Sequence, residues 1–275
     1  MKVFKTDKGI IIEKDGNSYQ LLGYEWDSFI NDDNLYEKLL RLTQSLAAMT
    51  EMAFTPKAPI GNQELWACGV TYYRSMLGRQ EESKDAGGGD FYGRVYDAER
   101  PEVFFKSTAQ RVADPGGFVR IRKDSSWDVP EPELTLMVTS SGKIVGYTIG
   151  NDMSSRSIEG ENPLYLPQAK TYDGCASIGP CIYVPGKPID PDTVIALTIL
   201  RNDIVVFTAN VSVSQMKRSP EELVSFVYKE CSFPFGCLIM TGTGIVPGND
   251  FTLRTDDRIH IEIDHIGQLV NTVAS

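Results

Sequence analysis

One segment constrains the fold of this chain more than any other. Residues 131–152 read EPELTLMVTSSGKIVGYTIGND, in which two apolar runs flank the sequence Ser140-Ser141-Gly142-Lys143. This pattern is typical of an antiparallel β-hairpin. If the turn is centred between Ser141 and Gly142, the predicted pairs on one face are all apolar: Leu134 with Ile149, Leu136 with Tyr147, and Val138 with Val145.

The opposite face of the predicted hairpin carries acids. Because side chains alternate along a strand, Glu131 lies directly across from Asp152, and Glu133 lies two residues along on the same face. Like charges this close destabilise a sheet unless they are neutralised, and a hard cation with oxygen ligands is the usual solution. The hairpin therefore predicts a metal site, which a register shift of one residue would abolish.

A plainer interpretation of the same residues stays open at this point. Pro130 and Pro132 cannot donate ladder hydrogen bonds, so the acids are also compatible with a solvated edge strand or a bulge. If a metal binds, an all-carboxylate site suits Mg²⁺, with Mn²⁺ or Ca²⁺ as substitutes. Zinc is disfavoured, because the chain has only two histidines, His260 and His265, both near the C-terminus.

The composition excludes several classes of protein. The 275 residues are 41% hydrophobic and 23% charged, as in compact globular proteins. A net charge of −10 with scattered lysines and arginines disfavours nucleic acid as a partner. The start, MKVFKTDKGI, lacks a signal-peptide core, no stretch has the roughly 18 apolar residues of a membrane span, and the five cysteines lack CxxC spacing. We therefore expect a cytoplasmic protein with reduced thiols and no membrane partner.

The first 59 residues are predicted to form a small N-terminal domain. Residues 2–30 alternate short apolar runs with turns, which predicts two or three strands around Asp15-Gly16. Leucines at positions 35, 39, 42 and 46 predict a helix over residues 34–52, with Asp33 or Asn34 as its N-cap. Residues 56–59 then serve as a linker to a catalytic domain over residues 60–275.

The predicted catalytic domain is a strand-rich, mostly antiparallel body. Short β-rich runs separated by Gly, Pro, Asn and Asp dominate from about residue 64 onward. One later helix is predicted to begin after Ser219, because Pro220 suits the first helical position and Glu222 completes a capping box. The triplet Gly87-Gly88-Gly89 predicts a mobile lid over residues 79–93 that excludes water when substrate binds.

Several motifs resemble those of the fumarylacetoacetate hydrolase superfamily over roughly residues 64–275. They are EPE in WDVPEPELTLMV, NDMSSR, the lysine of LPQAKTYDG, and TGTGIVPG. The longer stretches VYDAERPEVFFKST, ENPLYLPQAKTYDGCASIGP and TGTGIVPGND are similar, more specifically, to the 2-keto-3-deoxy-D-arabinonate dehydratase branch. The resemblance implies an α+β fold, a strand-rich mixed β-sandwich roll with a small N-terminal α/β accessory region, and a homodimer or homotetramer.

The resemblance also implies an activity and a set of site residues. The activity is Mg²⁺-dependent dehydration of a 2-keto-3-deoxy sugar acid, in which C3 loses a proton and C4 loses its hydroxyl. The implied metal ligands are the hairpin acids Glu131, Glu133 and Asp152. The implied catalytic residues are Glu102 and Lys170, and the implied substrate-binding residues are Lys106 and Thr243. By pattern alone, Lys170 is compatible with a surface charge, Glu102 with a charge at a strand start, and Thr241-Gly242-Thr243-Gly244 with a simple turn.

One departure from the superfamily pattern bears on the reaction. Many hydrolases of the superfamily carry a Gly-x-Asn-Tyr segment followed by His and Glu, whereas here Gly69-Val70-Thr71-Tyr72 leads to Ser75 and Gly78. The pair that activates water in those relatives is missing. This weighs against the first alternative, a hydrolase that cleaves a C–C bond in a 1,3-dicarbonyl acid. The second alternative, a non-enzymatic metal- or ligand-binding protein, stays open.

Overall fold

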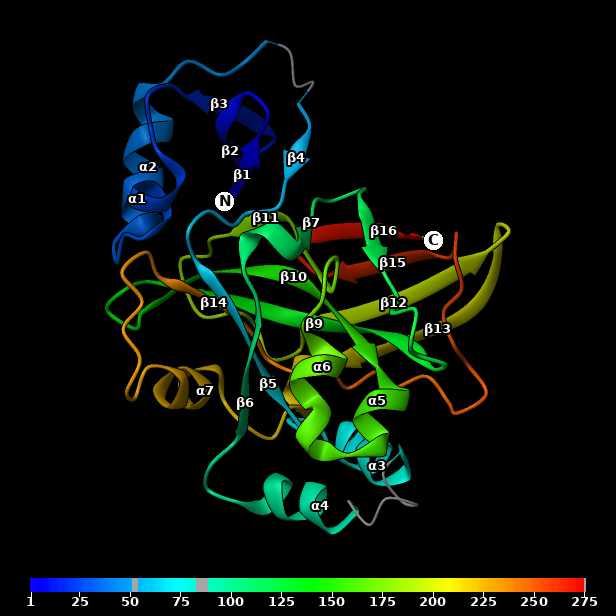
Figure 1. Ribbon diagram of the computed structural model, residues 1–275. Helices are drawn as coiled ribbons and strands as arrows, with labels where there is room; N and C mark the ends of the chain where they lie inside the picture. The colour runs from blue at the N-terminus through cyan, green and yellow to red at the C-terminus, as the bar shows by residue number, and fades with distance from the viewer. Residues whose placement is uncertain (51–53, 83–88, 275) are drawn as a thin grey trace.

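The protein is built on two β-sheets, with helices gathered at the ends of their strands (Figure 1). The computed structural model describes residues 1–50, 54–82 and 89–274. One sheet has eleven strands, nine of which run in the order β3-β2-β1-β11-β10-β9-β14-β5-β6, with β4 paired to β1 and β7 to β11. The other has five strands in the order β13-β12-β15-β16-β8. Among the described residues, no helix is long and apolar enough to cross a membrane.

The N-terminal region confirms the predicted small strands. Its elements are β1 (Lys2–Thr6), β2 (Gly9–Lys14), β3 (Asn17–Leu21), α1 (Trp26–Ile30) and α2 (Leu35–Ser45). The β2–β3 turn places Asp15 and Gly16 at φ values of 51° and 77°, the left-handed region that such a turn requires. The predicted helix was too long, because it ends at Ser45 and not at residue 52. Beyond its extended C-cap, the Met49 amide donates to the Ser18 carbonyl at 2.8 Å, so the chain runs back to the strands.

The predicted linker contributes a strand. Residues 56 and 57 form β4 (Pro56–Lys57), which pairs with β1. β1 in turn pairs with β11, with Lys2 opposite Tyr183, so the N-terminal strands extend the large sheet. The domain boundary between residues 59 and 60 stays a prediction.

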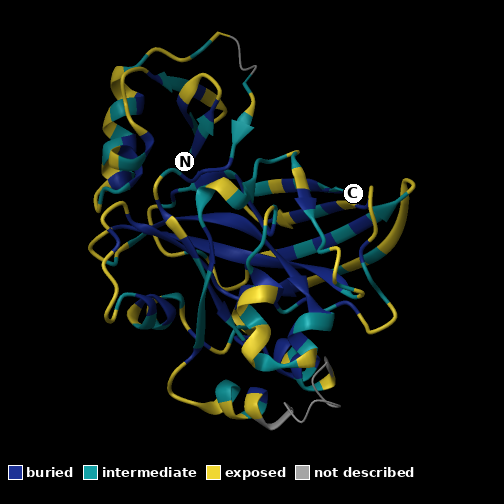
Figure 2. Ribbon diagram, viewed as in Figure 1, coloured by how far each residue is buried: buried dark blue, intermediate teal, exposed yellow. Residues whose placement is uncertain are grey.

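The large sheet is mixed, and its centre is the predicted hairpin. Its remaining strands are β5 (Glu64–Gly69), β6 (Glu102–Ser107), β7 (Val112–Ala113), β9 (Asp128–Val138), β10 (Ile144–Ser155), β11 (Ala176–Tyr183) and β14 (Cys237–Met240). Every residue of β9 and β10 is buried except Ile144, which is half-buried (Figure 2). β14 runs parallel to β5 and antiparallel to β9. The hairpin is therefore enclosed by strands on both sides.

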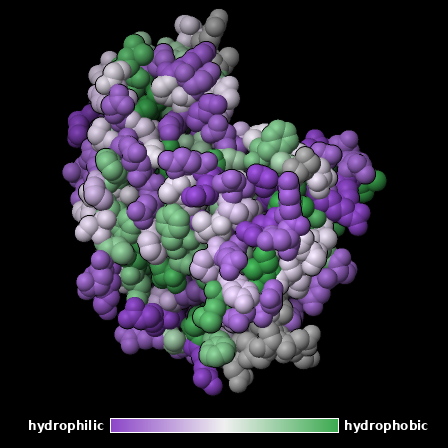
Figure 3. Space-filling view, in the orientation of Figure 1, coloured by the Kyte–Doolittle hydropathy of each residue, from purple (hydrophilic) through white to green (hydrophobic). Residues whose placement is uncertain are grey.

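The second sheet packs on the apolar face of the hairpin. Its strands are β8 (Phe118–Arg120), β12 (Val194–Arg201), β13 (Ile204–Ser212), β15 (Arg258–Ile263) and β16 (Gly267–Ala274). Leu134 and Leu136 of β9 share one buried cluster with alternate residues of β12 and β15, such as Leu197 and Ile261. Side chains that alternate along each strand thus meet between the two sheets. Hydrophilic residues cover most of the face shown in Figure 3, with hydrophobic residues in small groups.

The remaining helices follow the strands of the hairpin or connect strands beside the hairpin. They are α3 (Tyr73–Glu82), α4 (Gly89–Asp97), α5 (Arg156–Glu161), α6 (Leu166–Lys170), α7 (Pro220–Val227) and the 3₁₀ turns η1 (Ala109–Arg111), η2 (Pro163–Tyr165) and η3 (Val213–Gln215). The predicted cap of α7 is confirmed, since the Ser219 hydroxyl accepts from the Glu222 amide at 3.1 Å. The segment predicted as a mobile lid is helical at both ends, in α3 and α4, and residues 83–88 between them lie outside the described residues.

The predicted hairpin register is confirmed at the acid end and wrong near the turn. Leu134 pairs with Ile149 and Leu136 with Tyr147, as expected. Val138, however, pairs with Ile144 and not with Val145, because the register shifts between Ile144 and Gly146. A bulge of this kind turns the extra residue to the other face, and Val145 accordingly joins the core cluster on the opposite side of the sheet.

Candidate metal centre

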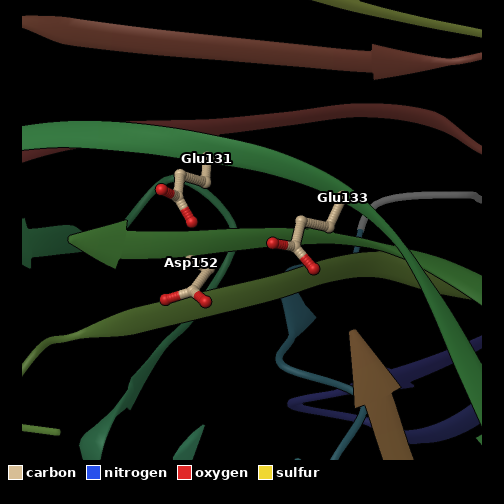
Figure 4. Close-up of side chains that lie close together, drawn as sticks. All are labelled: Glu131, Glu133 and Asp152. Carbon is tan, nitrogen blue, oxygen red and sulfur yellow. The ribbon is translucent and has the colours of Figure 1, made fainter. Parts of the chain in front are cut away.

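Three carboxylates converge at the open end of the hairpin. Glu131 and Glu133 project from β9, and Asp152 projects from β10 directly opposite Glu131 (Figure 4). Each offers an oxygen, and these oxygens all lie within 4.8 Å of one another. The three residues are only 5%, 2% and 1% exposed. The prediction that the acids meet on one face is confirmed, and the alternative of a solvated strand edge is wrong.

The two prolines are accommodated because β9 loses a neighbour at this point. β14 pairs with β9 only from Thr135 to Val138, so Pro130 and Pro132 lie beyond its ladder. Their missing N–H groups therefore cost no hydrogen bond to β14. The chain leaving β14 then turns toward the acids, and the Gly242 amide donates to Glu133 Oε2 at 2.6 Å.

The electrostatics of the three acids differ, and they favour a cation beside Glu133. Burial raises the pKa of Glu133 well above its usual value, and the neighbouring Asp152 and Glu131 carboxylates raise it further. Burial also opposes ionisation of Glu131, but Lys170, Arg79 and Arg156 together lower its pKa to about 2. Glu133 is thus the acid of the triad whose charged form is least favourable without a cation. Three buried oxygen ligands without histidine or cysteine fit a hard divalent cation such as Mg²⁺.

Lys170 belongs to this centre and not to the protein surface. It is the last residue of α6 and is fully buried. Its Nζ lies 2.5 Å from Glu131 Oε2 and 3.4 Å from Asp152 Oδ2. Burial lowers the pKa of Lys170, but Asp152 and Glu131 outweigh this effect and the pKa is raised. A cation that neutralises those two carboxylates would remove the contribution that raises the pKa of Lys170.

Lys106 has a different environment from Lys170. This fully buried side chain on β6 contacts Asp152 Oδ1 at 2.5 Å. It also donates to the carbonyl of Met153 at 2.9 Å and to the carbonyl of Lys170. Two of its three N–H donors thus serve backbone carbonyls, and its charge is paired with Asp152. The described residues that line the space beside the carboxylates do not include Lys106, so its substrate contact stays a prediction.

Glu102 stands at the rim of the same space. It begins β6 opposite Gly69, where any Cβ atom would collide with the Glu102 carboxylate. Within the described part of the chain, its Oε2 is buried and has no hydrogen-bond partner. Gly69 and Phe104, which alternates with Glu102 along β6, both line the space beside the acids. The position is compatible with the predicted role in catalysis, which stays a prediction.

The Thr241–Gly244 turn, which by pattern alone was compatible with a simple turn, contacts one of the metal-ligand candidates. The Gly242 amide of this turn donates to Glu133 Oε2. Thr243 lines the space, and its hydroxyl accepts from the Ile245 amide at 3.1 Å, while its contact with substrate stays a prediction. The turn therefore fixes one metal-ligand candidate and leaves the Thr243 side chain beside the site.

Sequence reasoning missed three buried charged residues of this centre. Arg156 lies in the NDMSSR motif, and its Nη2 is 3.7 Å from Glu131 Oε1. Arg79 on α3 forms an ion pair with Glu159 on α5, and Arg79 and Arg156 both line the space beside the acids. The motif was a signal for Arg156. Arg79 was hidden because the glycine triplet nearby indicated a loop.

The residues at the positions of the hydrolytic pair cannot move a proton to water. The Ser75 hydroxyl donates to the Tyr72 carbonyl at 2.7 Å and accepts from the Tyr72 amide at 3.2 Å, so it closes a local turn. Gly78 has no side chain, and a Cβ atom there would crowd Val246. Neither residue offers an acid or a base.

Comparison with known proteins identifies the family. The family model described as fumarylacetoacetate (FAA) hydrolase C-terminal matches residues 92–274. The chain belongs to this family. It is 50% identical over 218 residues to a probable 2-keto-3-deoxyxylonate dehydratase of Haloferax volcanii, which covers 79% of this chain and 74% of that protein. It is 41% identical over 217 residues to the 2-dehydro-3-deoxy-D-arabinonate dehydratase of Saccharolobus solfataricus, covering 78% and 73%.

A solved structure of the family shares the whole fold. It is 2-keto-3-deoxy-D-arabinonate dehydratase complexed with magnesium and 2,5-dioxopentanoate. The two chains are 32% identical, the match covers 100% of this chain and 99% of that one, and the TM-score is 0.82. The predicted fold class, a strand-rich mixed roll of the fumarylacetoacetate hydrolase type, is confirmed.

Proposed function

We propose that this protein is a Mg²⁺-dependent dehydratase of 2-keto-3-deoxy sugar acids, such as the conversion of 2-keto-3-deoxy-D-arabinonate to 2,5-dioxopentanoate. The observation that carries the proposal is the buried triad of carboxylates with Lys170 among them. Two relatives above 40% identity bear the names of such dehydratases, and the solved relative holds magnesium and 2,5-dioxopentanoate.

The balance of buried charge suits an anionic substrate. Four acids at the centre, Glu131, Glu133, Asp152 and Glu159, face four cations, Lys106, Lys170, Arg79 and Arg156, and all eight are buried. The formal charges of these side chains cancel. A divalent ion held by the triad leaves an excess of two positive charges, which a 2-oxo acid reduces. The centre is therefore complementary to a small carboxylic acid.

The loss of water in the proposed reaction needs two proton transfers, which we assign to Lys170 and Glu102. Mg²⁺, held by Glu131, Glu133 and Asp152, supplies positive charge that polarises the 2-oxo group when it is bound. One of the two side chains takes the proton from C3, and the other gives a proton to the departing C4 hydroxyl, which leaves as water. The 5-hydroxy-2-oxopent-3-enoate so formed is an isomer of 2,5-dioxopentanoate and converts to it by tautomerisation, in which protons move from C5 and its hydroxyl to C3 and C4. Thr243 lies beside the same space and is proposed to hold the substrate.

The competing functions lack a supporting observation. A hydrolase of this family needs a base for water, and Ser75 and Gly78 provide none. A protein that only stores or carries a metal does not need Lys170, whose buried ammonium lies between two of the three metal-ligand candidates. Dehydration uses both the cation site and the lysine.

We also infer two properties of the working enzyme. The family resemblance supports a homodimer or homotetramer, which light scattering of the purified protein tests. Four of the five free cysteines are buried, which suits a reducing compartment such as the cytoplasm. Fractionation of the source cells tests this location.

The deciding experiment offers the enzyme three kinds of ligand. We expect 2-keto-3-deoxypentonate with Mg²⁺ to yield 2,5-dioxopentanoate, followed by proton NMR, and EDTA to abolish the conversion. A 1,3-dicarbonyl acid such as acetopyruvate tests C–C hydrolysis in parallel. Cleavage of acetopyruvate without dehydration would establish the hydrolase, and Mg²⁺ binding without turnover of any acid would leave a binding protein. A panel of C5 and C6 acids then defines the substrate and its C4 stereochemistry.

A further inference from the structure

The ion pair between α3 and α5 is unusual for its burial. The Arg79 and Glu159 side chains are only 6% and 1% exposed. A second arginine on α3 provides a comparison, because Arg74 pairs with Glu81 at 3.4 Å with side chains 40% and 49% exposed. Buried ion pairs are costly to desolvate and seldom add stability. The placement of Arg79 therefore calls for another explanation than stability.

Arg79 differs from the other cations that line the space beside the acids. Lys170 and Arg156 both contact Glu131, a metal-ligand candidate. Arg79 contacts Glu159, which is not one of the triad. A guanidinium has five N–H donors and can serve more than one acceptor at a time. Arg79 thus lines the site while its ion pair is made with a carboxylate outside the triad.

Glu159 couples this orientation to the strand that carries Asp152. Its Oε2 accepts from the Ser154 hydroxyl at 3.1 Å, and Ser154 lies two residues after Asp152 on β10. The Arg79 guanidinium also lies 5.8 Å from the centre of the Tyr92 ring on α4. The carboxylate and the ring therefore hold the guanidinium from two directions.

Two other donors close to the triad already serve protein groups. The Gly242 amide donates to Glu133, and the Lys106 ammonium is surrounded by three acceptors. We propose that Arg79 binds the carboxylate of the 2-oxo acid and that Glu159 is the positioning residue that aims its guanidinium. The planar fork of arginine matches a carboxylate in a bidentate geometry. The inference rests on the proposed function only in taking a 2-oxo acid as the ligand.

Binding of an unreactive acid tests the inference without relying on turnover. 2-Oxopentanoate has the chain length of a pentonate but no hydroxyl to lose, and 2-oxopentanamide lacks the negative charge. With Mg²⁺ present, we expect Arg79→Gln to lower the affinity for 2-oxopentanoate about ten- to a hundredfold, as measured by calorimetry. This is the effect of losing one charged hydrogen-bonded pair. Binding of the amide should change less than about twofold. Arg74→Gln, on the same helix, is the matched control and should change neither.

Glu159 has a signature that a purely structural residue would not show. Glu159→Gln should lower the affinity for 2-oxopentanoate more than the affinity for 2-oxopentanamide. The loss for 2-oxopentanoate should be smaller than the loss that Arg79→Gln causes. The double variant should bind the acid no more weakly than Arg79→Gln alone, because the carboxylate acts through the guanidinium. Additive losses, or equal losses for acid and amide, would overturn the positioning role.

The outcomes separate this inference from the proposed function. Wild-type affinity of a folded Arg79→Gln variant for 2-oxopentanoate would overturn the inference even if dehydration is observed. An acid-selective loss in a protein that dehydrates no sugar acid would support the inference and reject the proposed function. If circular dichroism shows that Arg79→Gln does not fold, Arg79→Lys decides, because it keeps the charge and removes the fork. A several-fold loss for the acid alone supports the inference, and unchanged binding overturns it.

Discussion

The two ends of the β9–β10 hairpin share the same two strands and differ in their surroundings. At the open end, Glu131 pairs with Asp152 in an unbroken register, and β14 no longer pairs with β9. At the turn end, a bulge shifts the register, and strands enclose β9 on both sides. A cavity of about 620 Å³ lies beside the turn, lined largely by apolar and tyrosine side chains such as Val145, Tyr147 and Tyr228.

This difference shows where a buried sheet can hold charge. Strand ladders satisfy backbone groups but leave no donors for carboxylates. Where β14 leaves the ladder at Met240, the freed chain supplies the Gly242 amide to Glu133, and α6 supplies Lys170 to Glu131. At the turn end, β14 stays paired with β9, and the β9 residues Leu136, Met137 and Val138 are buried and apolar. We infer that loss of one neighbouring strand is what permits a charged site inside this sheet.

The largest expected effect follows from neutralising one acid at the open end. Glu133→Gln keeps the shape of the side chain and removes its charge, so Mg²⁺-dependent dehydration should fall below detection. The fold should persist, because the change also removes repulsion from Glu131 and Asp152. Glu262→Gln on β15, in an exposed position, is the control. Substantial turnover by Glu133→Gln, measured by proton NMR, would contradict the metal assignment.

The next largest effect is expected on the free energy of unfolding, when the buried partner of Asp152 is removed. Lys106→Met preserves much of the volume of the side chain but leaves Asp152 without its 2.5 Å partner. Breaking a buried pair from one side costs roughly 3–5 kcal/mol, so denaturant unfolding in EDTA should show a loss of this order. Saturating Mg²⁺ should restore part of it by neutralising Asp152. An equal loss of unfolding free energy with and without Mg²⁺ would show that Lys106 does not interact with the metal centre.

Lys170→Met distinguishes catalysis from binding. If Lys170 moves a proton, kcat should fall by about 10² or more, while Mg²⁺ affinity changes little. Lys187→Met, in the lining of the cavity at the turn end, is the control. A raised KM with kcat near the wild-type value would make Lys170 a substrate partner only, and no change in either parameter would remove it from the site.

The smallest effect is expected at the turn. Gly142 has a φ of 85°, which an alanine adopts at a cost of roughly 1–2 kcal/mol, while a Cβ atom there has room beside Tyr228. Gly142→Ala should therefore lower the unfolding free energy by that amount and leave kcat unchanged. Ser140→Ala, exposed in the same turn, should change neither quantity. A fall in kcat for Gly142→Ala would show that the two ends of the hairpin are coupled.

The alternation of side chains along strands made the pairing of the acids at the open end of the hairpin predictable. The features that the sequence did not predict depend on tertiary contacts. The pairing of Glu131 with Asp152 follows from apolar residues that must share one face. The bulge near Val145 depends on neighbours across the sheet, since a Cβ atom at Gly146 would collide with Ile182. The Arg79–Glu159 pair joins two helices far apart in sequence, and no spacing rule links them.

Calorimetric titration with Mg²⁺ tests the central claim most directly. If Glu131, Glu133 and Asp152 form the metal centre, the wild-type protein should bind one Mg²⁺ per chain at this site. Glu133→Gln should lose that binding, while Gly142→Ala and Glu262→Gln should keep it. Mg²⁺ binding by folded Glu133→Gln with the wild-type affinity and stoichiometry would show that the buried carboxylates do not hold the ion.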